Sequence, residues 1–289
     1  MRLGLAAFLL AASSTLATAD TISVGGTQRS YILERAATGK PAPLIVALHG
    51  GGGSAQQFRM DSGLTPMANA AGISVVYPES VTRQWNDGRA RPGSRVDKTD
   101  DLGFLKSLVQ ELVAKGVADP QRIIFTGVSN GGMLSYAMAC NTDLPIYAVA
   151  PVSANVDEGM DCSHTSARLL NIVGTADRIV PMQGGTVLFG LGQGRVESSA
   201  QSFAMFMEAA GCSGTTSREL PNTVDDGMVS TVTIAKGCAR SRIAQVVVQG
   251  GGHSWPGGQQ AYGRKLGIAT QDFSASQLVV DLALGKANF

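Results

Sequence analysis

The chain has 289 residues, of which 44% are hydrophobic and 16% are charged, and its mean hydropathy is +0.10. This composition excludes an intrinsically disordered protein, which has few apolar residues and a high net charge. The 23 Lys and Arg residues nearly balance the 22 Asp and Glu residues, so the formal net charge is +1. Because such a chain has no basic field, neither nucleic acid nor an anionic membrane is expected as a partner.

The N-terminal segment has the three parts of a secretory signal peptide. Arg2 supplies a positive charge, residues 3–12 form a short apolar run, and residues 17–19 are the small residues of a cleavage site. A first buried helix is the alternative, and a membrane span would need about 18 apolar residues or more. We expect residues 1–19 to be removed, leaving residues 20–289 as one soluble, secreted or periplasmic domain.

The four cysteines are Cys140, Cys162, Cys212 and Cys238. An even number of cysteines in an oxidising compartment predicts disulfides, here two, for which three pairings are possible. We favour Cys140–Cys162 and Cys212–Cys238 because each pair closes a short local loop. Zinc binding would need closely spaced cysteine pairs, which the sequence lacks, so no metal is expected.

Short apolar segments alternate with helical patterns along the chain. Residues 22–33, interrupted by Gly25-Gly26, predict an N-terminal hairpin. Six further segments are typical of strands buried on both faces: residues 44–48, 73–77, 122–126, 147–152, 169–173 and 242–248. Helices are predicted over residues 101–114, 133–140, 198–210 and 274–284. Asp100 and Asp101 are expected to cap the first of these helices rather than to take part in catalysis.

This alternation of strands and helices predicts an α/β fold. The central sheet should be mostly parallel, with helices covering both of its faces in a single domain. In such sheets the reactive groups lie beyond the carboxyl ends of the strands. The residues that directly follow each predicted strand are therefore the candidates for function.

A glycine-flanked serine follows the strand at residues 122–126. Residues 127–131 read G-V-S-N-G and lead into a predicted helix. In a nucleophile elbow the serine takes a strained turn between strand and helix, and the glycines prevent clashes there. An ordinary glycine-rich turn is the alternative, but the strand before and the helix after favour Ser129 as a nucleophile.

A serine hydroxyl needs an adjacent base, and the sequence offers three histidines. Hydrolases with a nucleophile elbow place serine, acid and histidine in that order along the chain, and only His164 and His253 follow Ser129. His164 leaves little room for an intervening acid at a strand end of its own. His253, which follows the last strong strand, is therefore the predicted base.

The acid of the triad is expected after a strand between the serine and the histidine. Asp177 meets this condition, since it follows the strand at residues 169–173. Other acids in this interval are Asp157, Glu158, Asp161 and the pair Asp225–Asp226, of which the last precedes a glycine and suggests a hairpin turn. We expect Asp177 to orient the imidazole and to stabilise its cation.

Residues 49–53 read H-G-G-G-G and directly follow the first core strand. A loop without side chains can turn its backbone N–H groups toward a developing oxyanion. Gly51 or Gly52 is expected to supply one donor and the Asn130 amide the other, while His49 should be a structural hydrogen-bonding residue. A dinucleotide-binding loop is the alternative, but its G-x-G-x-x-G form is not matched.

The two tryptophans of the chain, Trp85 and Trp255, each lie in a loop after a strand end. Aromatic side chains line most ligand clefts, so both are candidate substrate-binding residues. Simple packing at the rim of the pocket is the alternative for each of them.

Four segments resemble the polyhydroxybutyrate-depolymerase-like esterase family, which also contains feruloyl and acetylxylan esterases. They are residues 48–52 (LHGGG), residues 127–133 (GVSNGGM), residues 174–177 (GTAD) with Val180-Pro181, and residues 250–257 (GGGHSWPG). The resemblance spans most of residues 20–289 and implies an α/β-hydrolase fold, a serine mechanism without a cofactor, and carboxylic ester substrates. One departure is the segment at residues 203–206 (FAMF), where relatives often carry a tryptophan.

The resulting hypothesis is a secreted serine esterase that acts through an acyl-enzyme. Its substrates would be short polyhydroxyalkanoate oligomers or feruloyl and acetyl esters of sugars. The sequence shows no linker and no second core, so soluble esters are expected to be preferred over crystalline polymer. A peptidase or amidase on the same fold and a non-catalytic binding module are the alternatives, and a complete triad argues against the second. The oligomeric state and the natural ester stay open.

Overall fold

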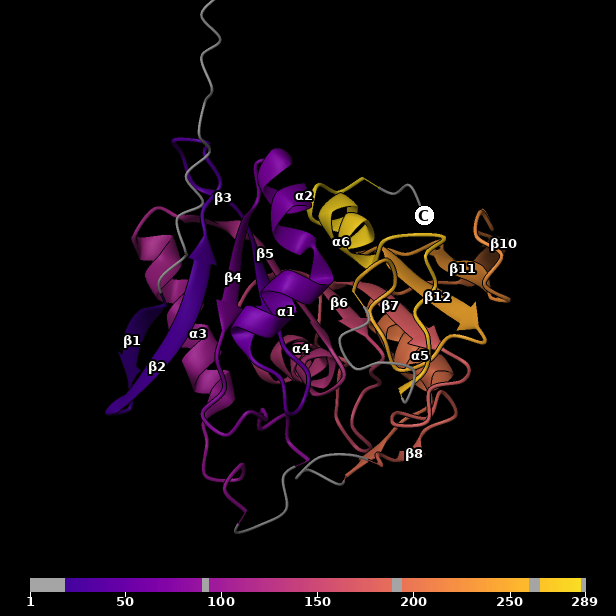
Figure 1. The fold of residues 1–289 in the computed structure, drawn as a ribbon, viewed down its shortest axis with the longest axis horizontal. Coiled ribbons are helices and arrows are strands. Elements are labelled where there is room, and N and C mark those ends of the chain that lie inside the picture. Colours follow the sequence, from indigo (N-terminus) through magenta and orange to yellow (C-terminus); the bar gives the residue numbers. More distant parts are fainter. Residues whose placement is uncertain (1–18, 90–93, 189–193, 260–265, 287–289) are drawn as a thin grey trace, which may run out of the picture.

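The computed structural model describes residues 19–89, 94–188, 194–259 and 266–286. The segment expected to be a signal peptide therefore lies, except for its last residue, outside the described residues. The described chain builds a ten-stranded sheet in the order β1-β2-β4-β3-β5-β6-β7-β12-β11-β10, with helices on either side (Figure 1). A separate two-stranded sheet pairs β8 with β9.

The strands are β1 Asp20–Val24, β2 Thr27–Glu34, β3 Ala42–Leu48, β4 Ser74–Pro78, β5 Ala118–Val128, β6 Ile146–Val152, β7 Arg168–Gly174, β8 Gly185–Thr186, β9 Arg195–Val196, β10 Gly214–Glu219, β11 Val229–Lys236 and β12 Ile243–Gln249. The helices are α1 Ala55–Ser62, α2 Leu64–Ala70, α3 Asp101–Ala114, α4 Asn130–Asn141, α5 Ser199–Ala209 and α6 Ala275–Ala283.

The centre of the sheet is parallel, as the alternation of strands and helices predicts. Strands β4, β3, β5, β6, β7 and β12 pair in parallel. At the two edges, β1 with β2 and β10 with β11 form antiparallel hairpins. The first hairpin was expected, and its turn residues Gly25 and Gly26 have φ values of 56° and 79°. For the second hairpin the sequence suggested only the turn at Asp225–Asp226, and its first strand was missed because β10 (GTTSRE) is exposed along most of its length and has no apolar pattern.

Helices cover both faces of the sheet because side chains alternate along each strand. On β3, Leu44 and Val46 pack into the same core as Phe104 of α3, and α4 and α5 add to that layer. Ile45 points to the opposite face, where it shares a core with Phe58 of α1 and with side chains of α2 and α6. Within the described ranges no helix has the length and hydropathy needed to cross a membrane.

The start of α3 shows why Asp100 and Asp101 have structural roles. The Asp100 carboxylate accepts a hydrogen bond from the Gly103 amide at 2.8 Å and so caps the helix. Asp101 is buried and forms an ion pair with Arg29 at 2.6 Å. Helix α3 therefore has the bounds that its sequence pattern predicts, and its first acidic residues hold it in place.

Two disulfides confirm the expected pairing. Cys140 at the end of α4 is joined to Cys162 in the loop before β7, and Cys212 after α5 is joined to Cys238 after β11. Each bridge links segments that lie close together along the chain. The first of them holds the helix that follows Ser129.

Candidate active site

Ser129 occupies a tight turn between β5 and α4. Its φ of 58° and ψ of −124° place a non-glycine residue in the left-handed half of the backbone map, which L-residues adopt only at a cost. The neighbouring glycines are needed because the turn packs against β3. A Cβ atom on Gly127 would lie 2.6 Å from the Leu48 carbonyl oxygen, and one on Gly131 would overlap that oxygen. The turn has the shape that the G-x-S-x-G pattern predicts.

His253 and Asp177 are joined by a hydrogen bond. The two residues follow β12 and β7, which are neighbouring parallel strands, and His253 Nδ1 lies 2.8 Å from Asp177 Oδ2. Because a carboxylate only accepts, Nδ1 carries the proton and Nε2 is left as the basic nitrogen. The other oxygen, Oδ1, accepts from the amides of Ile179 at 2.8 Å and Val180 at 2.9 Å. The carboxylate is thereby held on both sides.

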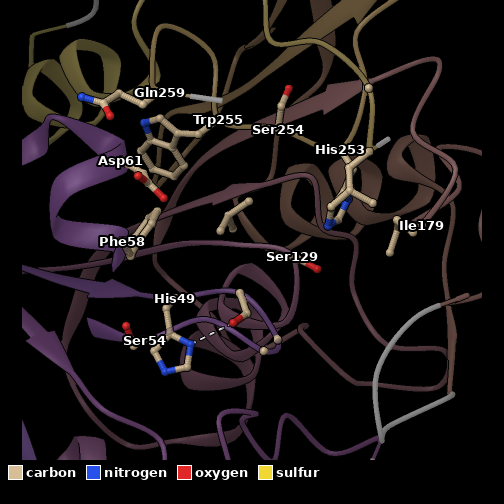
Figure 2. Close-up of a pocket in the computed structure, with 16 residues that line it drawn as sticks. His49, Ser54, Phe58, Asp61, Ser129, Ile179, His253, Ser254, Trp255 and Gln259 are labelled. Atoms are coloured by element: carbon tan, nitrogen blue, oxygen red, sulfur yellow. Dashed lines mark hydrogen bonds between the residues drawn. The ribbon is translucent and has the colours of Figure 1, made fainter. Parts of the chain in front are cut away.

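A pocket of about 230 Å³ brings Ser129 and His253 into one cavity (Figure 2). Asp177 lies behind the histidine and does not line the pocket. The apolar side chains of the wall are Phe58, Val128, Ile179, Trp255 and Leu266. The polar side chains, apart from Ser129 and His253, are His49, Ser54, Asp61, Ser254 and Gln259. An apolar cavity with a hydroxyl and an imidazole at one end can hold a small organic substrate beside a base.

The glycine-rich loop after β3 lies against the turn that carries Ser129. A Cβ atom on Gly51 would lie 3.8 Å from Asn130 Cβ, so the two residues that carry the candidate amide donors are neighbours. In the described parts of the chain, no group accepts a hydrogen bond from either the Gly51 or the Asn130 amide, whereas the Gly52 amide donates to the Arg83 carbonyl oxygen at 2.7 Å. Of the two glycines expected to bind an oxyanion, this geometry favours Gly51.

Trp85 does not line the pocket, unlike the expectation from its place after a strand end. Its side chain is 1% exposed and lies beneath the two loops just described. The indole nitrogen donates to the His49 carbonyl oxygen at 2.9 Å, and the backbone amide donates to Asn130 Oδ1 at 2.7 Å. Trp85 therefore ties the glycine-rich loop to the residue after Ser129, and it has no surface for substrate.

The side chain of Asn130 continues into a buried group of charges. Asn130 Nδ2 donates to Asp87 Oδ2 at 2.6 Å, and Asp87 pairs with Arg89, which also lies 2.9 Å from Asp157. Burial raises the pKa of the Asp157 carboxyl well above its usual range, the Asp87 carboxylate raises it further, and the Arg89 guanidinium lowers it. These contacts hold the start of α4 in a fixed orientation.

His49 has the structural role expected for it. The imidazole is 1% exposed, its Nδ1 lies 2.8 Å from the Gly50 carbonyl oxygen (Figure 2), and its Nε2 lies 3.2 Å from Glu79 Oε1. Burial alone raises the pKa of Glu79, but hydrogen bonds from His49 and the Ala55 amide outweigh it, so that the pKa is lowered. His49 thus fixes the glycine-rich loop through its ring.

Trp255 lines the pocket, as expected. Its indole nitrogen donates to Ser276 Oγ at 3.0 Å, and its ring meets that of Phe58 edge to face with 5.1 Å between the centroids. The two rings form one apolar wall of the cavity.

The other titratable residues considered from the sequence lie elsewhere. His164 is 87% exposed, with Asp161 3.8 Å away, and Glu158 pairs with Arg195 at 2.7 Å. Asp225–Asp226 lie in the loop that joins β10 to β11. Within the described ranges, no three His, Cys, Asp or Glu side chains gather as ligands for a metal ion.

The part of the pocket formed by α1 and the loop beyond Trp255 was not predicted from the sequence. Phe58, Asp61 and Gln259 lie there. A signal for the helix was present, since Ser54 Oγ accepts from the Gln57 amide at 3.2 Å and a serine three residues before a glutamine is typical of a helix start. With only eight residues, α1 is too short to show a clear helical pattern.

Comparison with known proteins identifies the family to which the chain belongs. The family described as "Esterase PHB depolymerase" matches residues 29–182, more than half of the chain. "Putative esterase NocK" of Nocardia uniformis subsp. tsuyamanensis is 30% identical over 93% of this chain and 83% of its own length. "Feruloyl esterase B" of Piromyces equi is 26% identical over 77% of this chain, which spans only 41% of that protein.

Among solved structures, the acetyl xylan esterase from Aspergillus awamori shares the fold. It superposes with a TM-score of 0.57 at 14% identity, over 82% of this chain and 94% of its own. The α/β-hydrolase fold implied by the resemblance is thus confirmed. The chain belongs to the polyhydroxybutyrate depolymerase esterase family and is a serine hydrolase that acts on carboxylic esters.

Proposed function

We propose that Ser129, His253 and Asp177 form the catalytic triad of this esterase. The observation that carries the proposal is the 2.8 Å bond between His253 and Asp177, made by a histidine that shares one pocket with Ser129. Ser129 sits in a strained turn at the start of a helix, which exposes its hydroxyl. Nucleophile, base and orienting acid then follow three strands of one parallel sheet.

In the proposed reaction, Ser129 Oγ attacks the ester carbonyl carbon while His253 Nε2 takes the hydroxyl proton. Asp177 stabilises the imidazolium through Nδ1. The amides of Gly51 and Asn130 hold the negative charge on the carbonyl oxygen of the tetrahedral intermediate. His253 then gives its proton to the leaving alcohol, which leaves an acyl group on Ser129. Water, deprotonated by His253, then attacks the acyl carbon, the bond to Ser129 Oγ breaks, and His253 returns the proton to Oγ as the acid leaves.

The substrates we propose are soluble esters with a small acyl group. Pockets for drug-sized ligands typically have volumes of about 300–1,000 Å³. The cavity of this protein, at about 230 Å³, is smaller and therefore suits a small acyl group. Short hydroxyalkanoate oligomers and feruloyl or acetyl esters of sugars are the candidate classes. The matching family is described as a polyhydroxybutyrate depolymerase esterase, and one relative is named a feruloyl esterase.

We further propose that residues 1–19 are a signal peptide and that the protein acts outside the cytoplasm. The two disulfides support this proposal because such bridges persist in oxidising compartments.

A labelling experiment tests the triad. A fluorophosphonate probe should modify Ser129 alone, as read by peptide mass spectrometry, and Ser129→Ala should lose turnover of an activated ester by about 10⁴-fold or more while its thermal unfolding is unchanged. Labelling at another serine, or more than a few per cent of wild-type turnover in the variant, would contradict the assignment. Faster cleavage of an amide than of the ester with the same acyl group would instead favour an amidase.

A further inference from the structure

Most of the pocket wall is apolar, but Asp61 places a carboxylate at the end that lies away from Ser129. The residue is in the last turn of α1, next to the edge-to-face pair of Phe58 and Trp255 (Figure 2). A charged oxygen is costly in such surroundings unless it is hydrogen-bonded. The position of Asp61 therefore raises the question of what its carboxylate binds.

Neighbouring groups hold the carboxylate but leave it able to accept further hydrogen bonds. Gln57 Nε2, one turn earlier, lies 2.8 Å from both oxygens, and the Gln259 amide donates to the Asp61 carbonyl oxygen at 2.9 Å. None of the ion pairs among the described residues involves Asp61. Since a carboxylate offers about four lone-pair sites, acceptor sites remain for a ligand.

We propose that Asp61 determines substrate specificity by accepting a hydrogen bond from a hydroxyl at the end of the acyl group remote from the ester. The inference rests on the proposed function, because it takes Ser129 as the point where the ester carbonyl lies. An apolar cavity of about 150 Å³ holds one benzene ring. A cavity of about 230 Å³ therefore accommodates one ring and a short linker.

The aromatic wall favours a flat hydroxyaryl group over an aliphatic chain with a terminal hydroxyl. Phe58 and Trp255 offer ring faces and edges against which an aromatic ring packs well. An ammonium group is the less suitable partner, since it loses more hydration than a hydroxyl does on entering an apolar cavity. An acyl group that is only an acetyl would not reach the carboxylate.

Matched pairs of methyl esters test the proposal with the full-length protein. One pair is 4-hydroxycinnamate and cinnamate, and the other is 6-hydroxyhexanoate and hexanoate. Wild type should show a kcat/KM ratio of hydroxyl to plain ester of about 10- to 100-fold in the aromatic pair, as is typical of a hydrogen bond to a charged group. In Asp61→Leu the ratio should fall to about 1, and in Asp61→Asn it should lie in between.

Helix α6 offers a matched control. Gln277 Nε2 donates to Asp281 Oδ1 at 3.1 Å with the same spacing of four residues, outside the pocket. Asp281→Leu should keep the wild-type ratio. Because both esters of a pair are measured on one preparation, the ratio does not depend on the fraction of folded enzyme.

Three outcomes would overturn the inference: a wild-type ratio near 1, an unchanged ratio in Asp61→Leu, or faster turnover of 6-aminohexanoate than of 6-hydroxyhexanoate methyl ester. A large ratio in the aliphatic pair alone would assign the site to a hydroxyalkyl rather than a hydroxyaryl group, against our choice. If wild type hydrolyses an activated acetate ester but none of these esters, the inference fails; if it hydrolyses no ester at all, the proposed function fails instead.

Discussion

The two ends of the pocket are built by different means. At the end that holds Ser129, backbone conformation shapes the site: Ser129 sits in a left-handed turn, and Gly51 lies against Asn130. At the far end, side chains of α1 and of the loop after β12 form the wall, including Phe58 and Asp61. The first region supplies the groups proposed for the reaction, and the second supplies shape and polarity.

The difference teaches which substitutions each end tolerates. A Cβ atom on Gly131 or Gly127 would clash with the backbone of β3, so neither glycine can be replaced by a larger residue without moving the turn. The side chains at the far end extend from a helix that is held by its own cap and by the Ser276–Ser62 contact at 2.6 Å. Changes there should alter which ester is bound before they alter the rate of the chemical step.

The largest effect is expected from Asp177→Asn, which keeps the shape of the triad but reverses the hydrogen bond to the histidine. The amide would present a donor to Nδ1 and favour the wrong tautomer of His253. We expect kcat to fall by about 10⁴-fold. Steady-state kinetics on an activated ester would measure it, with Asp161→Asn as a control because that acid is 69% exposed and lies beside His164 rather than His253. Equal losses in the two variants would contradict the role of Asp177.

Much of the catalytic end could be predicted because its signals are local. A glycine pattern after an apolar strand specifies a turn and places it at a known edge of the sheet, so the positions of Ser129 and His253 at that edge could be predicted from the sequence. Trp85 shows the limit of this reasoning, because whether an aromatic ring faces a cavity or the core depends on contacts distant in sequence, here with His49 and Asn130. The short, mostly polar α1 gave no periodic signal, and Asp61 was missed with it.

Trp85→Phe should give a smaller loss at the catalytic end without touching the ester. The variant keeps an aromatic ring but removes the indole bond to the His49 carbonyl oxygen, which joins the glycine-rich loop to Asn130. If Gly51 and Asn130 bind the oxyanion, a small displacement between them weakens transition-state binding, so we expect kcat to fall about tenfold with KM nearly unchanged, less than for the loss of a whole donor.

Trp255→Phe is the matched comparison, because it also removes an indole donor, here to Ser276, but at the pocket wall. This variant should raise KM more than it lowers kcat, since its ring contacts the bound group in ground state and transition state alike. The same pattern of kcat and KM changes in both variants would remove the distinction between the two ends of the pocket.

The smallest effect is expected from Glu79→Gln, which weakens the support of the glycine-rich loop through His49. Because the pKa of Glu79 is lowered in the folded protein, its ionised form stabilises the fold above the ordinary pKa of a glutamate, and this contribution disappears as the pH falls through the lowered value. Glu79 is 30% exposed, so solvent screening limits the contribution to about 1 kcal/mol or less.

Urea unfolding should show a lower free energy of unfolding for Glu79→Gln than for wild type at pH 7. This difference should shrink as the pH is lowered below the ordinary pKa of a glutamate. Glu158→Gln, which removes the carboxylate of an exposed pair with Arg195, is the matched surface control. A difference that grows toward low pH would contradict the lowered pKa and with it the role of the His49–Glu79 contact in holding the loop.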